Sequence, residues 1–167
     1  MSFFIVCIAW CIALYSLRLA FGNLAYSLVM STPQPVLARA AEFLGSEEAD
    51  DSVEDEPLIR FLKRFYMIRM LSLLVLAGEA LTIGYFVVEM PGNPFIWAAL
   101  SLRFFMVWVF RYWLSTAAEE DDSLDPFSRL KQVPGWVRNW ERIGRLLYSL
   151  CYVGMILSLL DFLPAIS

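Results

Sequence analysis

The sequence predicts an all-α integral membrane protein, a bundle of four transmembrane helices with short amphipathic helices at its cytoplasmic surface. The first observation is composition: 59% of the 167 residues are hydrophobic, 18% are charged, and the mean hydropathy is +0.60. Soluble domains have about 45–50% apolar and about 25% charged residues. The second is that four stretches reach the roughly twenty residues that cross a hydrocarbon core of about 30 Å. These spans, at 3–30, 66–89, 95–114 and 146–163, leave room only for a single membrane domain over 1–167.

The first stretch, 3–30, resembles a secretory signal peptide only superficially. No Lys or Arg precedes it, and it is far longer than the 7–15 residue apolar region of such peptides. We therefore expect a retained span. Cys7 and Cys11 lie in it and Cys151 lies in the last span, without a Cys-x-x-Cys motif, so we expect them to be small packing residues.

The loop at 31–65 contains two helix signals. In "STPQPVLARAAEFLG", Pro35 can open a helix and Gly45 can end it. We expect this short helix to lie in the membrane interface on its apolar stripe. In "PLIRFLKRF" a second helix starts at Pro57 and should run directly into the span at 66–89. The stripe residues are Val36, Leu37, Ala40, Phe43 and Leu44.

The span at 66–89 carries an acid, Glu79, near its midpoint. The "PGNP" turn at 91–94 makes the next span an antiparallel neighbour, in which Arg103 lies at a matching depth. A charge left unpaired at the bilayer centre costs about 2.5–3.5 kcal/mol on insertion scales, so pairing is expected. The predicted intramembrane charge cluster consists of Arg18, Glu79 and Arg103, with Ser72 and Thr82 as further hydrogen-bonding groups.

The third span, 95–114, is unusually aromatic. Trp97, Tyr112 and Trp113 fit the interfacial belts in which Trp and Tyr are enriched. The remaining aromatic side chains lie deeper and point in several directions, so something should pack on more than one side of this helix. The candidates are lipid, a neighbouring subunit, a quinone or a pigment. The residues of this predicted face are Phe104, Phe105, Trp108 and Phe110.

The loop at 115–145 ends in "PGWVRNWERIGRLL". Trp136 and Trp140 recur on one side of a helical pattern, and Arg138 and Arg142 on the other. A basic, Trp-bearing amphipathic helix is typical of the headgroup boundary. We expect it to lie there before the chain turns inward into the span at 146–163.

Charge placement predicts the topology. Eleven of the thirteen Lys and Arg residues lie in or beside the loops at 31–65 and 115–145, whereas the termini and the turn at 91–94 carry none. The positive-inside rule places both loops in the cytoplasm and both termini outside. The acidic balance and the lack of a transit peptide favour a bacterial inner membrane.

The net charge of −4 comes from acidic runs at 47–56 and 119–125. They argue against nucleic acid as a partner and indicate either a solvated surface or a docking surface for a basic cytosolic partner. Both runs continue into similar motifs, "EEADDSVEDEPLIRFLK" and "EEDDSLDPFSRLK". The similarity fits either a duplicated hairpin or convergent loop chemistry.

The chain contains no histidine, which removes the usual haem and chlorophyll ligand, the zinc-protease motif and an imidazole base. Neither a phosphate-binding Gly loop nor G-x-S-x-G occurs. We therefore predict no catalytic residues, no metal and no required cofactor. The expected function is a non-catalytic subunit of a larger membrane complex, with other membrane subunits and lipid as partners. The alternative is a homo-oligomeric channel or small transporter using Glu79 and the intramembrane arginines, and a membrane enzyme acting on lipid ranks last.

Overall fold

The computed structural model describes residues 2–45, 55–120 and 126–160, and within them every regular element is a helix. Four helical stretches are long and apolar enough to cross a membrane: Phe3–Ser31, Glu56–Glu89, Pro94–Trp113 and Gly135–Leu159. The predicted all-helical fold with four candidate spans is thereby confirmed. The helices are α1 (Ser2–Phe21), α2 (Leu24–Ser31), α3 (Gln34–Gly45), α4 (Glu56–Glu89), α5 (Pro94–Glu120), α6 (Pro126–Lys131) and α7 (Gly135–Leu159).

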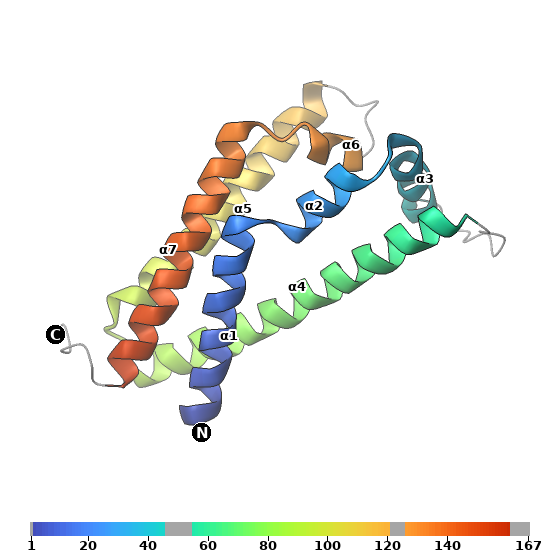
Figure 1. Ribbon diagram of the computed structural model, residues 1–167. Coiled ribbons are helices and arrows are strands. Elements are labelled where there is room, and N and C mark those ends of the chain that lie inside the picture. The colour runs from blue at the N-terminus through green and yellow to red at the C-terminus, as the bar shows by residue number, and fades with distance from the viewer. Residues whose placement is uncertain (1, 46–54, 121–125, 161–167) are drawn as a thin grey trace.

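The first candidate span, predicted at 3–30 and found at Phe3–Ser31, consists of two helices rather than one. α1 ends at Phe21, and α2 leaves it at an angle (Figure 1). Asn23 caps α2, because its side-chain oxygen accepts from the backbone N–H of Ala25 at 3.0 Å. α1 thus ends immediately before Gly22, and α2 begins immediately after its N-cap residue, Asn23. The twenty residues of α1 still extend about 30 Å.

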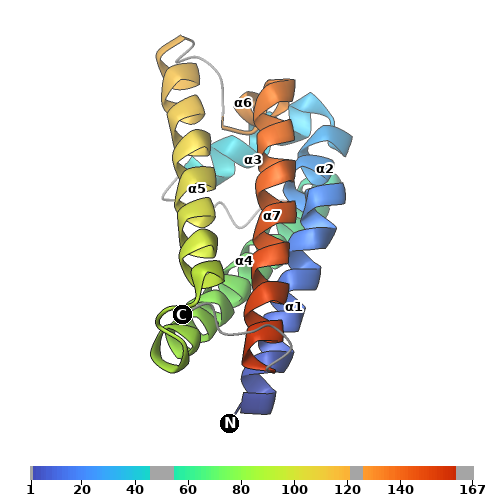
Figure 2. The ribbon, with the colours of Figure 1, turned by 90° about the vertical axis from the view of Figure 1, so that its left-hand side faces the viewer.

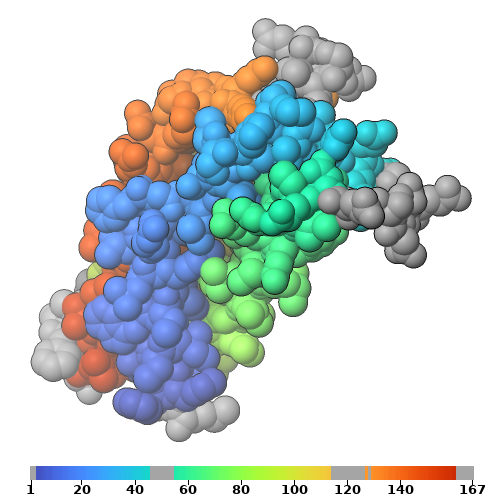
Figure 3. Space-filling view, turned by 45° about the vertical axis from the view of Figure 1, so that its right-hand side comes forward, coloured from blue at the N-terminus to red at the C-terminus, as the bar shows by residue number. Residues whose placement is uncertain are grey.

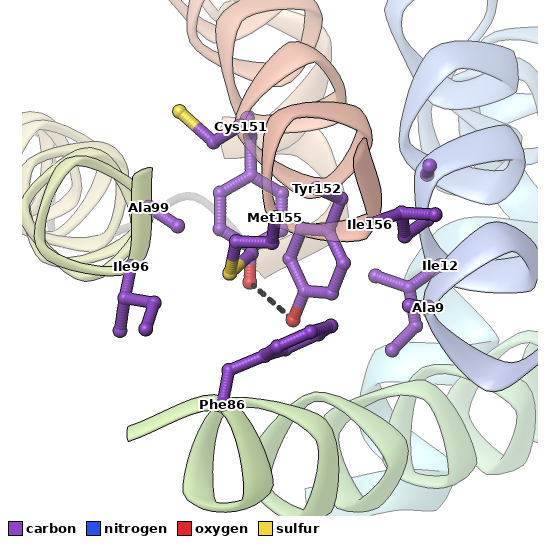
Figure 4. Close-up of a cluster of buried hydrophobic side chains, with 11 residues drawn as sticks. Ala9, Ile12, Phe86, Ile96, Ala99, Cys151, Tyr152, Met155 and Ile156 are labelled. Carbon is purple, nitrogen blue, oxygen red and sulfur yellow. Dashed lines mark hydrogen bonds between the residues drawn. The ribbon is translucent and has the colours of Figure 1, made fainter. Parts of the chain in front are cut away.

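The main bundle is formed by α1, α5 and α7. α7 lies between the other two and packs against both (Figure 2). Close approach of α5 and α7 depends on two glycines: a Cβ on Gly144 would meet Met106 at 2.8 Å, and one on Gly154 would meet the Phe95 ring at 2.7 Å. The end of α4 closes the core through Phe86 (Figure 4). Around it lie Ala9, Ile12, Ile96, Ala99, Tyr152, Met155 and Ile156.

α4 crosses the bundle obliquely, and its first turns leave it (Figure 1). As predicted, one helix runs from Glu56 through the second span. Its departing end forms a second core with α2, α3 and α6, in which the Phe61 and Phe127 rings meet edge to face at 5.4 Å. Figure 3 shows α2, α3 and the start of α4 as one continuous surface. This core contains Leu28, Val29, Leu37, Ala40, Leu58, Phe61, Leu62 and Phe127.

In the second core, the amphipathic helix predicted in the first loop packs its apolar stripe against other helices of the chain. α3 is present, but Leu37 and Ala40 from its apolar stripe are fully buried against protein. The physical reason is that the first turns of α4 lie outside the main bundle, where their apolar side chains pack against α3. In the last loop, the predicted interfacial segment and fourth span form one uninterrupted helix, α7, without the expected turn. α5 likewise continues past the predicted end of its span, to Glu120.

Most of the acidic residues of 47–56, and the side chains of 119–125, lie outside the described residues. The described exceptions are Asp55, which pairs with Arg39, and Glu56, which bonds Arg60 at 2.6 Å. A basic partner at these runs therefore stays a prediction.

Candidate functional site

The centre of the site is an ion pair between α4 and α5. Arg103 Nη2 lies 3.1 Å from Glu79 Oε2, and Glu79 is only 7% exposed. Glu79 lies ten residues before the end of α4 and Arg103 nine residues after Pro94, so each is roughly 14–15 Å from the turn. The turn itself is held by Asn93, whose side chain accepts from Phe95 N–H at 2.9 Å. The structure thus brings together the two residues that the tight turn predicts.

Two tyrosines from α7 extend this pair into the core. The Tyr148 hydroxyl hydrogen-bonds to Glu79, and it lies 3.5 Å from the hydroxyl of the fully buried Tyr152. All three polar groups are satisfied when Tyr152 donates to Tyr148 and Tyr148 donates to the carboxylate. Sequence reasoning missed these tyrosines. The available signal was two Tyr one turn apart in a span, away from its end, where interfacial aromatics are not expected.

Ser72 and Thr82 do not serve Glu79, which corrects the predicted hydrogen-bonding set. The Thr82 hydroxyl donates to the Gly78 carbonyl at 2.6 Å, and the Ser72 hydroxyl donates to the Ile68 carbonyl at 2.9 Å. Both are bonds to the residue four positions earlier, which helical Ser and Thr form readily. Both hydroxyl groups therefore donate their hydrogen bonds to backbone carbonyls of α4 and not to Glu79.

Arg18 lies at the end of α1, apart from the predicted cluster. It is exposed, bonds the Gly22 carbonyl at 3.4 Å, and makes no ion pair among the described residues. Arg142 likewise donates to the Ala20 carbonyl at 3.1 Å. Carbonyls at a helix C-terminus have no partner within the helix, and cations are favourable there. The break at Gly22 thus accounts for the position of Arg18.

Arg145 of α7 is the second cation that acts on Glu79 electrostatically. Its Nε and Nη2 atoms bond Glu141 Oε1 at 3.0 and 2.8 Å, and the same oxygen accepts from Asn23 Nδ2 at 2.9 Å. Glu141 and Arg145 therefore join the helix break at Asn23 to α7 by hydrogen bonds. Neither Arg145 nor Glu141 is among the site residues that the sequence predicts.

A cavity of about 330 Å³ adjoins Glu141 and Arg145. Arg103 and Arg145 form part of its wall, which is otherwise largely apolar. The Tyr26 hydroxyl is buried there and has no hydrogen-bond partner within the described part of the chain. The polar lining consists of Tyr15, Asn23, Tyr26, Ser72, Arg103, Arg111, Glu141 and Arg145.

The predicted aromatic set of α5 divides between two sides of the helix. Phe104 (75% exposed), Phe105 and Trp108 (55% exposed) lie on the outer surface, where the Phe105 and Trp108 ring centroids are 6.3 Å apart. Phe110 is partly buried and lines the cavity, and Phe105 borders both the cavity and the outer surface. On α7, Trp140 is exposed and meets Phe105 edge to face at 6.2 Å. Trp136, Arg138 and Arg142 are also exposed, and Arg142 donates to the Ala20 carbonyl of α1.

Among the described residues, no group of three or more His, Cys, Asp or Glu side chains is placed to hold a metal ion. Comparisons of the chain with protein family models, with curated proteins and with solved structures found no match. The function is therefore inferred from the geometry and chemistry of the described residues.

Proposed function

We propose that this chain is a non-catalytic subunit of a larger membrane protein complex, with a role in assembly, stabilisation or bridging. The observation that carries the proposal is the α5 aromatic face, defined as Phe104, Phe105 and Trp108. We further propose the orientation predicted by charge, with both termini outside the inner membrane of a bacterium.

The α5 aromatic face supports a protein contact because of its depth and exposure. α5 packs mainly on α7 and, through the Arg103–Glu79 pair, on α4, whereas Phe104 and Trp108 on its outer side are exposed. Phe104 lies ten residues into the helix, about 15 Å from its start, which is deeper than an interfacial belt requires. Large aromatic side chains are the residues that most often dominate protein interfaces.

The face also has a shape that suits another helix. Ser101, a small residue, lies beside Phe104 and Trp108 around a shallow hollow on the outside of α5. Small residues let transmembrane helices approach closely, and a serine hydroxyl can bond across the contact. A partner helix could therefore come close to α5 at Ser101 and pack against the aromatic rings of Phe104 and Trp108.

The test is to purify the tagged chain in mild detergent and read masses by native mass spectrometry. We expect different proteins in fixed stoichiometry with the wild type, and their loss with Phe104→Ala/Trp108→Ala. The matched control is Leu74→Ala/Leu81→Ala, which truncates two equally exposed side chains on α4. Loss with both variants, or a chain without foreign partners, would contradict the proposal.

A second candidate, a homo-oligomeric channel or small transporter, is favoured by one observation. The cavity leads from Arg103, at mid-span, to Arg111, two turns nearer the end of α5. A pure homo-oligomer in the same experiment would favour this candidate. Its own signature would be a change of flux in Glu79→Gln with the oligomer intact.

A further inference from the structure

We infer that the cavity between α2, α4, α5 and α7 is a binding site for one acidic phospholipid. The headgroup would lie near Arg111 and Tyr26, and an acyl chain would extend along the apolar wall toward Arg103. This goes beyond the proposed subunit role and is independent of it, because the cavity lies within a single chain.

Charge in the cavity favours an anion. Arg103 is paired with Glu79, and Arg145 is paired with Glu141, so these four charges compensate one another. Arg111 remains as the additional cation, with no ion pair among the described residues. Basic pockets between transmembrane helices on the cytoplasmic side are typical sites for anionic headgroups.

An unused hydrogen-bond donor lies in the same wall. The Tyr26 hydroxyl is shielded from solvent and bonds no described group. Leaving a buried hydroxyl unpaired costs free energy, so a ligand oxygen at this point would be stabilising. A phosphodiester supplies an acceptor oxygen for the Tyr26 hydroxyl and a negative charge for a wall in which Arg111 is the additional cation.

The remaining wall suits an acyl chain better than a small hydrophilic anion. Leu19, Met106 and Phe110 contribute to an apolar surface that dominates the lining. Arg111 lies eight residues beyond Arg103, so the cavity extends roughly 12 Å along α5. A soluble phosphate would fill only the Arg111 end and leave this apolar length uncovered.

The cavity is also accessible from the lipid side. α4 and α5 are joined by a tight turn and diverge from it, so they form a fork (Figure 1). Ser72 of α4 and Val107 of α5 both line the cavity and are both exposed. A lipid could therefore enter laterally from the bilayer, which is why we commit to a lipid as the occupant.

The experiment titrates the purified full chain, in detergent micelles, with palmitoyl-oleoyl phosphatidylglycerol or with phosphatidylcholine of the same acyl chains. Native mass spectrometry measures the bound fraction. We expect phosphatidylglycerol to bind about fivefold more tightly, and Arg111→Gln to remove that preference. Tyr26→Phe should weaken phosphatidylglycerol binding severalfold. Ser72→Phe, which fills the cavity without changing charge, should weaken both lipids.

The control is Arg69→Gln. Arg69 is exposed on α4, one residue from Ile68 of the cavity wall, but is not itself part of the lining. An equal effect of Arg69→Gln and Arg111→Gln would overturn the site in favour of diffuse surface charge. Equal binding of the two lipids would also overturn it. Displacement of the lipid by inorganic phosphate, with Ser72→Phe silent, would assign a soluble anion instead. None of these outcomes involves a protein partner, so the subunit proposal is tested separately.

Discussion

The ion pair between Glu79 and Arg103 shows why a single residue can matter more inside a membrane helix than at a surface. Glu79 is almost fully buried, and the side chain of Arg103 is 34% exposed, whereas Glu56 and Arg60 form a pair that is mostly in solvent. Exposed pairs contribute about 0–1 kcal/mol, because water and salt screen them. Removing one partner of a buried pair leaves the other charge without compensation.

A double-mutant cycle tests this difference. We expect Glu79→Gln to lower the free energy of unfolding by about 1–3 kcal/mol, since Arg103 loses its carboxylate. Glu79→Gln/Arg103→Gln should cost less than the sum of the single changes, with a coupling of about 1–3 kcal/mol. The measurement is unfolding in mixed micelles of increasing SDS fraction.

The same cycle at Glu56 and Arg60 is the control, with an expected coupling below about 0.5 kcal/mol. Strict additivity at Glu79 and Arg103 would show that the pair is not a stabilising contact. Tyr148 would then be the next group to examine, because its hydroxyl also bonds Glu79.

At the scale of the element, α5 and α7 pack closely because α7 has glycines at the points of contact. Gly154 faces the Phe95 ring so closely that a methyl group has no room, and the ring is a rigid neighbour. Gly84 of α4 is also helical, but a Cβ there would meet no atom within 4 Å. Gly154 is therefore needed for helix packing, whereas Gly84 makes no such contact.

Substitution of these glycines should separate the two roles. Gly154→Ala should lower the free energy of unfolding by about 1–3 kcal/mol, because overpacking forces α5 away from α7. Gly84→Ala should be neutral or slightly stabilising, since Ala is the better helix former. Thermal unfolding of the purified chain, followed by loss of helical circular dichroism, measures both. Equal effects of the two substitutions would show that the α5–α7 contact tolerates expansion.

At the scale of the whole molecule, the described residues form two large hydrophobic cores and a small third cluster of Trp113, Val133 and Val137. One large core lies among α1, α5 and α7, and the other lies where α2, α3 and α6 pack on the start of α4. Arg39, Arg60, Lys63, Arg64 and Lys131 lie on helices that form the second core, whereas Arg138, Arg142 and Arg145 lie on α7. The continuous helix α4 contributes side chains to both of these large cores.

Cysteine labelling tests the proposed orientation. Gly92 lies in the turn between α4 and α5, Gly45 ends α3, and both positions are exposed with open space around a Cβ. In a chain without its native cysteines, Gly92→Cys should react with an impermeant maleimide on intact cells. Gly45→Cys should react only after permeabilisation. The reverse pattern would invert the topology and place the lipid cavity toward the outer leaflet.

Much of the fold, and two of the three residues of the charge cluster, could be predicted from local information. Span length, the tight turn and the matching depths of Glu79 and Arg103 are properties of contiguous sequence, and they led to the observed helices and ion pair. The position of Arg18 could not be predicted in this way, because it depends on the break at Gly22. The roles of Tyr148 and Arg145 depend on how α7 is rotated about its axis, which no local pattern specifies.

The sequence by itself determined four apolar helices, their order and the pairing of an acid with an arginine across a short turn. A bilayer leaves few alternatives here, because every backbone polar group must be satisfied within its own helix and a buried charge needs a partner. Only the tertiary structure decided that α4 leaves the bundle, that α3 packs on protein, and that a cavity remains beside Arg103. These features follow from contacts between distant segments, such as Phe61 with Phe127, whose geometry depends on the packing of all the helices together.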